Sequence, residues 1–249
     1  MMRSIILRAG LVVCAFMPAP AALAATITVG TFSRDLNCIP FGCSSPNTAN
    51  PLDRYQQVYS HSLFATPSAI DSITFYAEPY GNYSETLPRS EKFSVAISTS
   101  RNPVNGLNLT NLDSNTGADR QSVYSGFLRS EFNSPARTLT FSLDKAFAYD
   151  PSMGDLLLDI AGDPKTQFQF ALYFFAESGR FEKGLTSRAT NWSTVPNGGG
   201  PYNNYGLVTT FGYTPISTVP EPSSWLLMVG GLGIVGAALR RKQRRRLEA

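Results

Sequence analysis

The central part of the chain alternates apolar and polar residues with the period of β-strands. Short segments rich in Val, Ile, Thr, Phe and Tyr, divided by turn residues, recur between residues 25 and 214. The clearest alternating sets are Phe93, Val95 and Ile97, then Leu139, Phe141 and Leu143, and then Leu156, Leu158 and Ile160. Because no long helical repeat interrupts them, we predict an all-β fold. Its expected form is an antiparallel β-sandwich of jelly-roll type, with a β-barrel as the alternative.

The first 24 residues have a different pattern. Arg3 and Arg8 precede a short apolar run, which ends in small residues and prolines. The triplet Ala22-Leu23-Ala24 fits a cleavage site of the A-x-A kind. We therefore predict a signal peptide over residues 1–24, with the Sec translocon and signal peptidase as partners.

A second apolar segment runs from Ser223 to Leu239 without a charged side chain. As a helix it would cover roughly 26 Å, the low end of what spans a bilayer. A basic tail over residues 240–249 follows, and its cations are Arg240, Arg241, Lys242, Arg244, Arg245 and Arg246. Such a cluster stays on the cytoplasmic side. The pattern predicts a transmembrane helix over residues 223–239 that anchors an exported domain at its C-terminal end.

The segment before this helix carries Pro220-Glu221-Pro222, within a stalk predicted over residues 215–222. Pro-Glu-Pro, an apolar helix and an arginine cluster in this order resemble the PEP-CTERM sorting signal. The resemblance implies processing by an exosortase in a Gram-negative bacterium that makes extracellular polysaccharide. It also implies an inner-membrane-anchored intermediate and a final place at the cell surface or in the matrix.

A softer resemblance covers parts of the exported domain itself. The segments RYQQVYSHSLF, SITFY and LLLDI are similar to segments of other exported PEP-CTERM proteins of unknown function. This resemblance supports a β-rich domain, and it implies no activity.

Charge and cysteine content narrow the class of protein. Between residues 25 and 219 there are 13 basic and 16 acidic residues, a net charge of −3, so the basic pI comes from the two ends. The sequence between these ends shows no basic patch that could bind phosphates, so we expect no nucleic-acid binding. Cys38 and Cys43 close a short loop, and in an oxidising compartment we predict a disulfide between them.

Catalytic chemistry finds little support in the sequence. His61 is the single histidine of the chain, and its neighbours Tyr59 and Leu63 suggest that it alternates with the apolar face of a strand. Candidate carboxylates for glycoside hydrolysis are Glu78, Glu85, Glu91, Asp155 and Asp159. Each of them is explained equally well as a surface charge, and no catalytic motif joins them. We therefore expect a protein that is not an enzyme.

Two sets of residues are candidates for ligand contact. Asp113, Asn115 and Asp119 place oxygen atoms at alternate positions of a loop that also contains Gly117, which suits calcium, although an Asx-rich turn explains it as well. The loop aromatics that suit stacking on sugar rings are Tyr80, Tyr83, Trp192, Tyr202 and Tyr205. The expected function is a structural or adhesive protein of the biofilm matrix. The alternative is a carbohydrate-binding module for exopolysaccharide, with calcium assistance, and a carboxylate-based glycosidase comes last.

Overall fold

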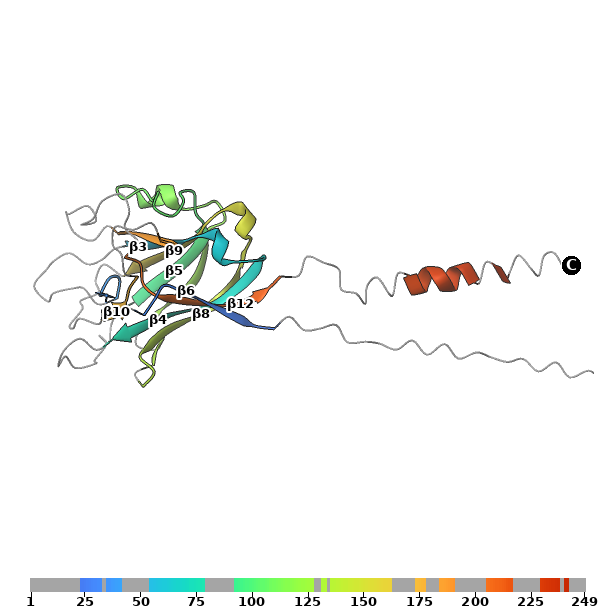
Figure 1. Ribbon diagram of the computed structural model, residues 1–249, viewed down its shortest axis with the longest axis horizontal. Coiled ribbons are helices and arrows are strands. Elements are labelled where there is room, and N and C mark those ends of the chain that lie inside the picture. The colour runs from blue at the N-terminus through green and yellow to red at the C-terminus, as the bar shows by residue number, and fades with distance from the viewer. Residues whose placement is uncertain are drawn as a thin grey trace, which may run out of the picture. The chain divides into compact units, whose positions relative to one another are not determined.

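The computed structural model describes residues 23–32, 35–41, 54–78, 92–127, 131–133, 135–162, 173–177, 184–190, 205–216, 229–237 and 240–241 of the 249-residue chain. The chain divides into two compact units. One unit is Leu23–Ile216, which includes the exported domain predicted over residues 25–214, and the other consists of the terminal segments Met1–Ala22 and Ser217–Ala249. The strands described below all belong to the unit Leu23–Ile216 (Figure 1).

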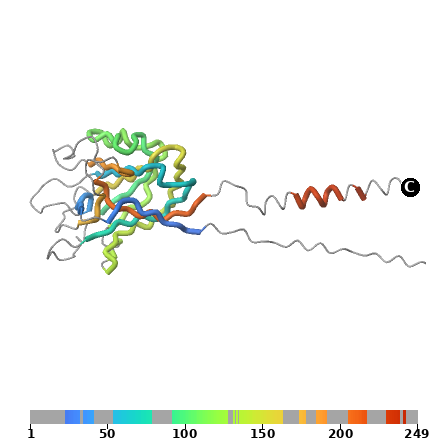
Figure 2. Tube along the Cα trace, viewed as in Figure 1, coloured from blue at the N-terminus to red at the C-terminus, as the bar shows by residue number. Residues whose placement is uncertain are grey.

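One sheet has seven strands, and every pairing in it is antiparallel. β1 (Ala25–Val29) pairs with β12 (Thr209–Pro215), which pairs with β4 (Ser68–Glu78), and β4 pairs with β8 (Thr138–Tyr149) on its other side. The short strands β7 (Phe132–Asn133), β10 (Tyr173–Phe175) and β2 (Leu36–Asn37) complete it, with β7 against β8 and β10 between β4 and β2. Figure 2 shows the first and last strands, β1 in blue and β12 in orange, side by side.

The second sheet has five antiparallel strands in the order β11, β3, β9, β5, β6. Their bounds are Thr186–Thr190 for β11, Arg54–Tyr59 for β3, Leu156–Gly162 for β9, Lys92–Thr99 for β5 and Gln121–Phe127 for β6. Three short 3₁₀ helices lie in the connections: η1 (His61–Leu63), η2 (Leu112–Asn115) and η3 (Pro151–Met153). η2 belongs to the long connection between β5 and β6.

A single hydrophobic core fills the space between the two sheets. Tyr59 of β3 and Phe211 of β12 meet edge to face with ring centroids 4.8 Å apart, and Tyr124 of β6 meets Phe141 of β8 at 4.9 Å. Both ring pairs join one sheet to the other, and such pairs contribute beyond the area that they bury. Since every member of this core cluster lies within Leu23–Ile216, that unit has the core it needs to fold by itself.

The prediction of an all-β domain with antiparallel sheets is confirmed, whereas jelly-roll connectivity stays a prediction. Phe93, Val95 and Ile97 are all buried, as the period-two pattern predicts. Strand β9 goes beyond the prediction, because Leu157 and Asp159, between its core-facing residues, are buried too. The outer face of the five-stranded sheet is therefore covered at this point.

The terminal segment Ser217–Ala249 contains helical residues at 229–237 and 240–241, so part of the predicted transmembrane helix 223–239 is helical. The rest of that segment lies outside the described residues. Within the described parts of the chain, no helix has the length and apolar character needed to cross a membrane. Arg240 and Arg241 are helical and exposed.

Candidate functional site

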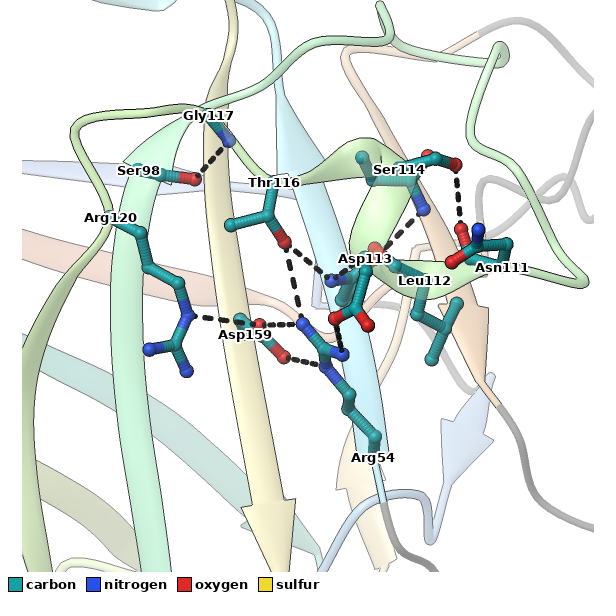
Figure 3. A network of polar contacts seen from close by, with 12 residues as sticks. Arg54, Ser98, Asn111, Leu112, Asp113, Ser114, Thr116, Gly117, Arg120 and Asp159 are labelled. Atoms are coloured by element: carbon teal, nitrogen blue, oxygen red, sulfur yellow. Dashed lines mark hydrogen bonds and ion pairs between the residues drawn. The ribbon is translucent and has the colours of Figure 1, made fainter.

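The connection between β5 and β6 covers the outer face of the five-stranded sheet and carries the residues that the sequence suggested for calcium. It is held there by polar side chains from the strands beneath it (Figure 3). Gln56 of β3 is fully buried, and its Nε2 donates a hydrogen bond to the carbonyl of Leu112 at 3.0 Å. Leu112 itself is buried. The connection is thus a fixed layer of the fold.

Arg54, at the start of β3, is the centre of the charged part of this contact (Figure 3). Its Nε and Nη2 donate to the two carboxylate oxygens of Asp159 on β9, at 2.8 and 2.6 Å. Its Nη1 donates to Asp113 on η2 at 2.5 Å, and Arg120 lies 3.7 Å from Asp159. Because the Asp159 side chain is only 4% exposed, its charge needs the guanidinium beside it. This ion pair was not predicted, although an aspartate within the apolar run LLLDI is the signal that could have found it.

The electrostatics of Arg54 follow from these two carboxylates. The hydrogen bond to Asp159 raises the pKa of Arg54 above its usual value, against the effect of burial, and the bond to Asp113 raises it further. In return, Arg54 lowers the pKa of the exposed Asp113. Asp113 is therefore an anion held by a protein cation, which is a structural role.

Asn115 is the second predicted calcium ligand, and its side chain is completely buried. Its Oδ1 accepts hydrogen bonds from Asn102 Nδ2 at 2.8 Å and from the Asn108 amide at 2.7 Å. Its Nδ2 donates to Gln56 Oε1 at 2.8 Å and to the Asn108 carbonyl at 2.9 Å. The amide group has a protein partner in every direction and ties the connection to itself and to β3.

Asp119, the third predicted ligand, binds the end of β5. Its carboxylate accepts from the amide of Thr99 at 2.9 and 3.0 Å and from the Thr99 hydroxyl at 2.7 Å. Asp113, Asn115 and Asp119 therefore have three different sets of protein partners. Among the described residues, no cluster of three His, Cys, Asp or Glu side chains could hold a metal ion. The calcium hypothesis stays a prediction.

Asp155 fastens the same connection at its other end. Its Oδ2 accepts from the amide of Val104 at 2.9 Å, and its Oδ1 accepts from the amide of His61 at 2.9 Å. The His61 ring places Nδ1 2.7 Å from the same Oδ1. The expectation that His61 alternates along a strand was wrong, because β3 ends at Tyr59 and His61 begins the 3₁₀ helix η1, where Ser60 caps it.

The structure describes three of the five candidate carboxylates for glycoside hydrolysis. Asp155 and Asp159 bind the groups described above, and Glu78 is the last residue of β4. Glu85 and Glu91 lie outside the described residues. The glycosidase alternative stays a prediction.

Of the predicted sugar-contacting aromatics, the structure describes Tyr205. Its hydroxyl donates to the carbonyl of Leu36, and the guanidinium of Arg188 lies 5.1 Å from its ring centroid. One face of the ring is therefore occupied, which suits an anchor for β2 better than an open stacking surface. Its role in sugar contact stays a prediction.

Several predicted residues lie outside the described parts of the chain. These are residues 1–22 of the signal peptide, Cys43, Tyr80, Tyr83, Trp192, Tyr202, Pro220, Glu221, Pro222, Lys242, Arg244, Arg245 and Arg246. Cys38 is disulfide-bonded, but because Cys43 lies outside the described residues, the pairing of these two cysteines stays a prediction.

Comparison with known protein families gives a match at the C-terminal end of the chain. The class of segment that it defines is a sorting signal of an exported protein, and not a catalytic or binding domain. Residues 218–242 match the model of the PEP-CTERM protein-sorting motif, and the chain carries this motif. The motif implies exosortase-dependent sorting of an exported protein, through a membrane-anchored intermediate. Searches of the curated proteins and of the solved structures gave no match to the chain.

Proposed function

We propose that the protein is a structural or adhesive component of an extracellular polysaccharide matrix, delivered to the cell surface of a Gram-negative bacterium by exosortase processing. The observation that carries this proposal is the sorting motif at residues 218–242, attached to a β-sandwich with a core of its own. A sorting signal of this kind marks an exported protein, and export supports a role outside the cell.

The contacts of four described acidic residues support a non-catalytic role. Asp113, Asp119, Asp155 and Asp159 contact an arginine, backbone amides, a threonine hydroxyl or, in the case of Asp155, also the His61 ring of the same domain. Catalytic carboxylates face a cleft in which a substrate is held, whereas these four hold the β5–β6 connection on the sheet. The sandwich is thereby a rigid domain whose long connection is fixed, as an adhesive or structural module requires.

The anchoring part of the proposal is tested in the host by deletion of residues 223–249. We expect the shortened protein to be exported and to appear in the culture medium without a membrane-bound stage. The control is the full chain, followed by fractionation and immunoblotting. If the shortened protein stays with the cells as the full chain does, the tail is not the anchor.

The matrix part is tested with the purified unit Leu23–Ile216 and the exopolysaccharide of the host. We expect saturable co-sedimentation, and loss of it in EDTA would assign a role to calcium at Asp113, Asn115 and Asp119. If no binding occurs at any calcium concentration, the adhesive role fails, and contact with other surface proteins takes its place.

A further inference from the structure

The outer face of the seven-stranded sheet carries a row of threonines, one on each of four neighbouring strands. In the strand register, Thr28 of β1 lies opposite Thr210 of β12, Thr210 opposite Thr74 of β4, and Thr74 opposite Thr140 of β8. Adjacent strands lie about 4.8 Å apart, so the row is about 14 Å wide. None of the four threonines is buried.

A second row lies two residues further along the strands and is also uncharged. It consists of Thr26, Gly212, Ser72 and Ser142, which the register again places side by side. A Cβ atom at Gly212 would come within 2.1 Å of the Ser72 hydroxyl oxygen. The absence of a side chain at Gly212 therefore leaves the space that this hydroxyl occupies. Asp71, at the β-bulge, accepts from the Ser72 hydroxyl at 2.9 Å and is an acidic neighbour of this row.

The hydroxyl groups of the first row bind one another. Thr28 and Thr210 have their Oγ1 atoms 2.7 Å apart, and the Oγ1 atoms of Thr74 and Thr140 are 3.0 Å apart. The Tyr76 hydroxyl lies 2.6 Å from Thr210 Oγ1. A hydroxyl group has one donor and two acceptor positions, so these contacts leave capacity for a ligand. They also hold each oxygen in place before a ligand arrives.

Aromatic rings lie next to the threonine row on the side where Tyr76 contacts it. Phe32 meets the Tyr76 ring edge to face at 4.9 Å and the Phe175 ring at 5.5 Å. Phe32 remains 57% exposed, although it is a large apolar side chain. Rings and hydroxyls thus share one surface of the domain, on the sheet face and not on the loops that the sequence singled out.

Sheet stability alone explains part of this pattern, because threonine favours strands and threonine pairs across strands are stabilising. It does not explain an exposed phenylalanine next to the row. Exposed aromatic rings pack against the C–H faces of sugar rings, and a fixed set of hydroxyls can exchange hydrogen bonds with sugar hydroxyls. An uncharged pair of rows also avoids the cost of removing water from an ion when a neutral polymer binds.

We propose that this face, defined by Thr28, Thr210, Thr74, Thr140, Tyr76 and Phe32, binds a neutral polysaccharide chain. The inference rests on the proposed matrix function and names the surface and ligand class for it. An anionic polysaccharide is disfavoured, since the two rows offer it no cation.

The test uses the unit Leu23–Ile216 with two insoluble neutral polymers, cellulose and chitin, and with an anionic alginate gel. The variant Thr28→Val/Thr74→Val keeps the β-branched shape and removes two hydroxyls. Phe32→Ala removes the exposed ring. Thr66→Val is the matched control, because Thr66 is exposed outside the array. Unfolding midpoints of all variants show whether the fold is kept.

We expect the wild-type unit to bind at least one neutral polymer. The double valine variant and Phe32→Ala should each bind it about tenfold more weakly, while Thr66→Val binds normally. If the array variants bind as the wild type does, the inference is wrong although the matrix function stands. Binding to alginate alone would also overturn it. If the unit binds none of these polymers and is not retained by the host exopolysaccharide, the adhesive function fails as well.

Discussion

Arg54 on β3 and Asp159 on β9 form a two-point ion pair beneath the β5–β6 connection, with both carboxylate oxygens accepting from the guanidinium. The pair lies on the outer face of a sheet whose inner face is the core. The Asp159 carboxylate is nevertheless shielded from water, because Arg54, η2 and its flanking residues lie over it. The domain therefore has a second, polar layer outside its hydrophobic core.

Replacement of Arg54 by methionine should leave the buried carboxylate of Asp159 without its cation. We expect the free energy of unfolding to fall by about 3 kcal/mol, measured by urea denaturation at pH 7. The double variant Arg54→Met/Asp159→Leu should recover at least half of the loss. Asp113→Asn, at the exposed end of the network, is the control and should leave the midpoint nearly unchanged. Equal effects of the Arg54 and Asp113 variants would contradict the assignment.

Asp155 should hold the start of the β5–β6 connection. In Asp155→Ala the amides of Val104 and His61 lose their acceptor, which we expect to cost about 1–3 kcal/mol. Hydrogen exchange at the Val104 amide should become faster in this variant. His61→Ala, which removes only the ring contact, is the comparison and should leave that exchange rate close to the wild-type value.

Alkaline conditions should weaken the core through its buried tyrosines. Burial raises the pKa of Tyr55 from 10.0 to about 12. Below pH 10 the phenol is neutral in both states, so stability there does not depend on it. Between about pH 10 and 12 only the unfolded chain ionises, so stability falls as pH rises, by up to about 3 kcal/mol. Denaturation midpoints over this range should fall less steeply in Tyr55→Phe, and an identical slope would refute the assignment.

Processing should depend on Glu221, between the two prolines of the sorting motif. Glu221→Ala is expected to slow the conversion of the membrane-anchored form to the mature form severalfold, because the motif is what the exosortase recognises. Pulse-chase labelling followed by mass spectrometry measures both forms. Glu248→Ala, beyond the basic cluster, is the matched control. Mature protein of normal mass that forms at the normal rate in Glu221→Ala would exclude this role.

The strands were accessible from the sequence because each alternates around one common core. The burial and the partners of the polar residues could not be predicted in this way, because they depend on which distant segments of the chain come into contact. From the sequence, Asp159 was a candidate for glycoside hydrolysis that a surface charge explained equally well. The β5–β6 connection instead buries it against Arg54, more than a hundred positions earlier in the chain. His61 follows an apolar strand pattern, but the Ser60 cap ends the strand and starts η1.

The threonine row could also be predicted only in part from the sequence. Thr26 with Thr28, and Thr138 with Thr140, stand at alternate positions, so their outward direction could be predicted from each segment. Their alignment across four strands depends on the register, which hydrogen bonding between distant segments sets. The sorting motif is the opposite case, since its residues are contiguous and need no partner to be recognised.

Strand β12 has a mechanical consequence for a domain held at its C-terminal end. It is the last strand before the sorting motif, yet it lies inside the sheet, with β1 on one side and β4 on the other. The amide of Ile216 adds a hydrogen bond to the Pro67 carbonyl at 2.8 Å. A pull on the tether would therefore load two hydrogen-bonded ladders in shear along the strand, instead of unzipping an edge one bond at a time. The domain is therefore attached through an interior strand and not through an edge.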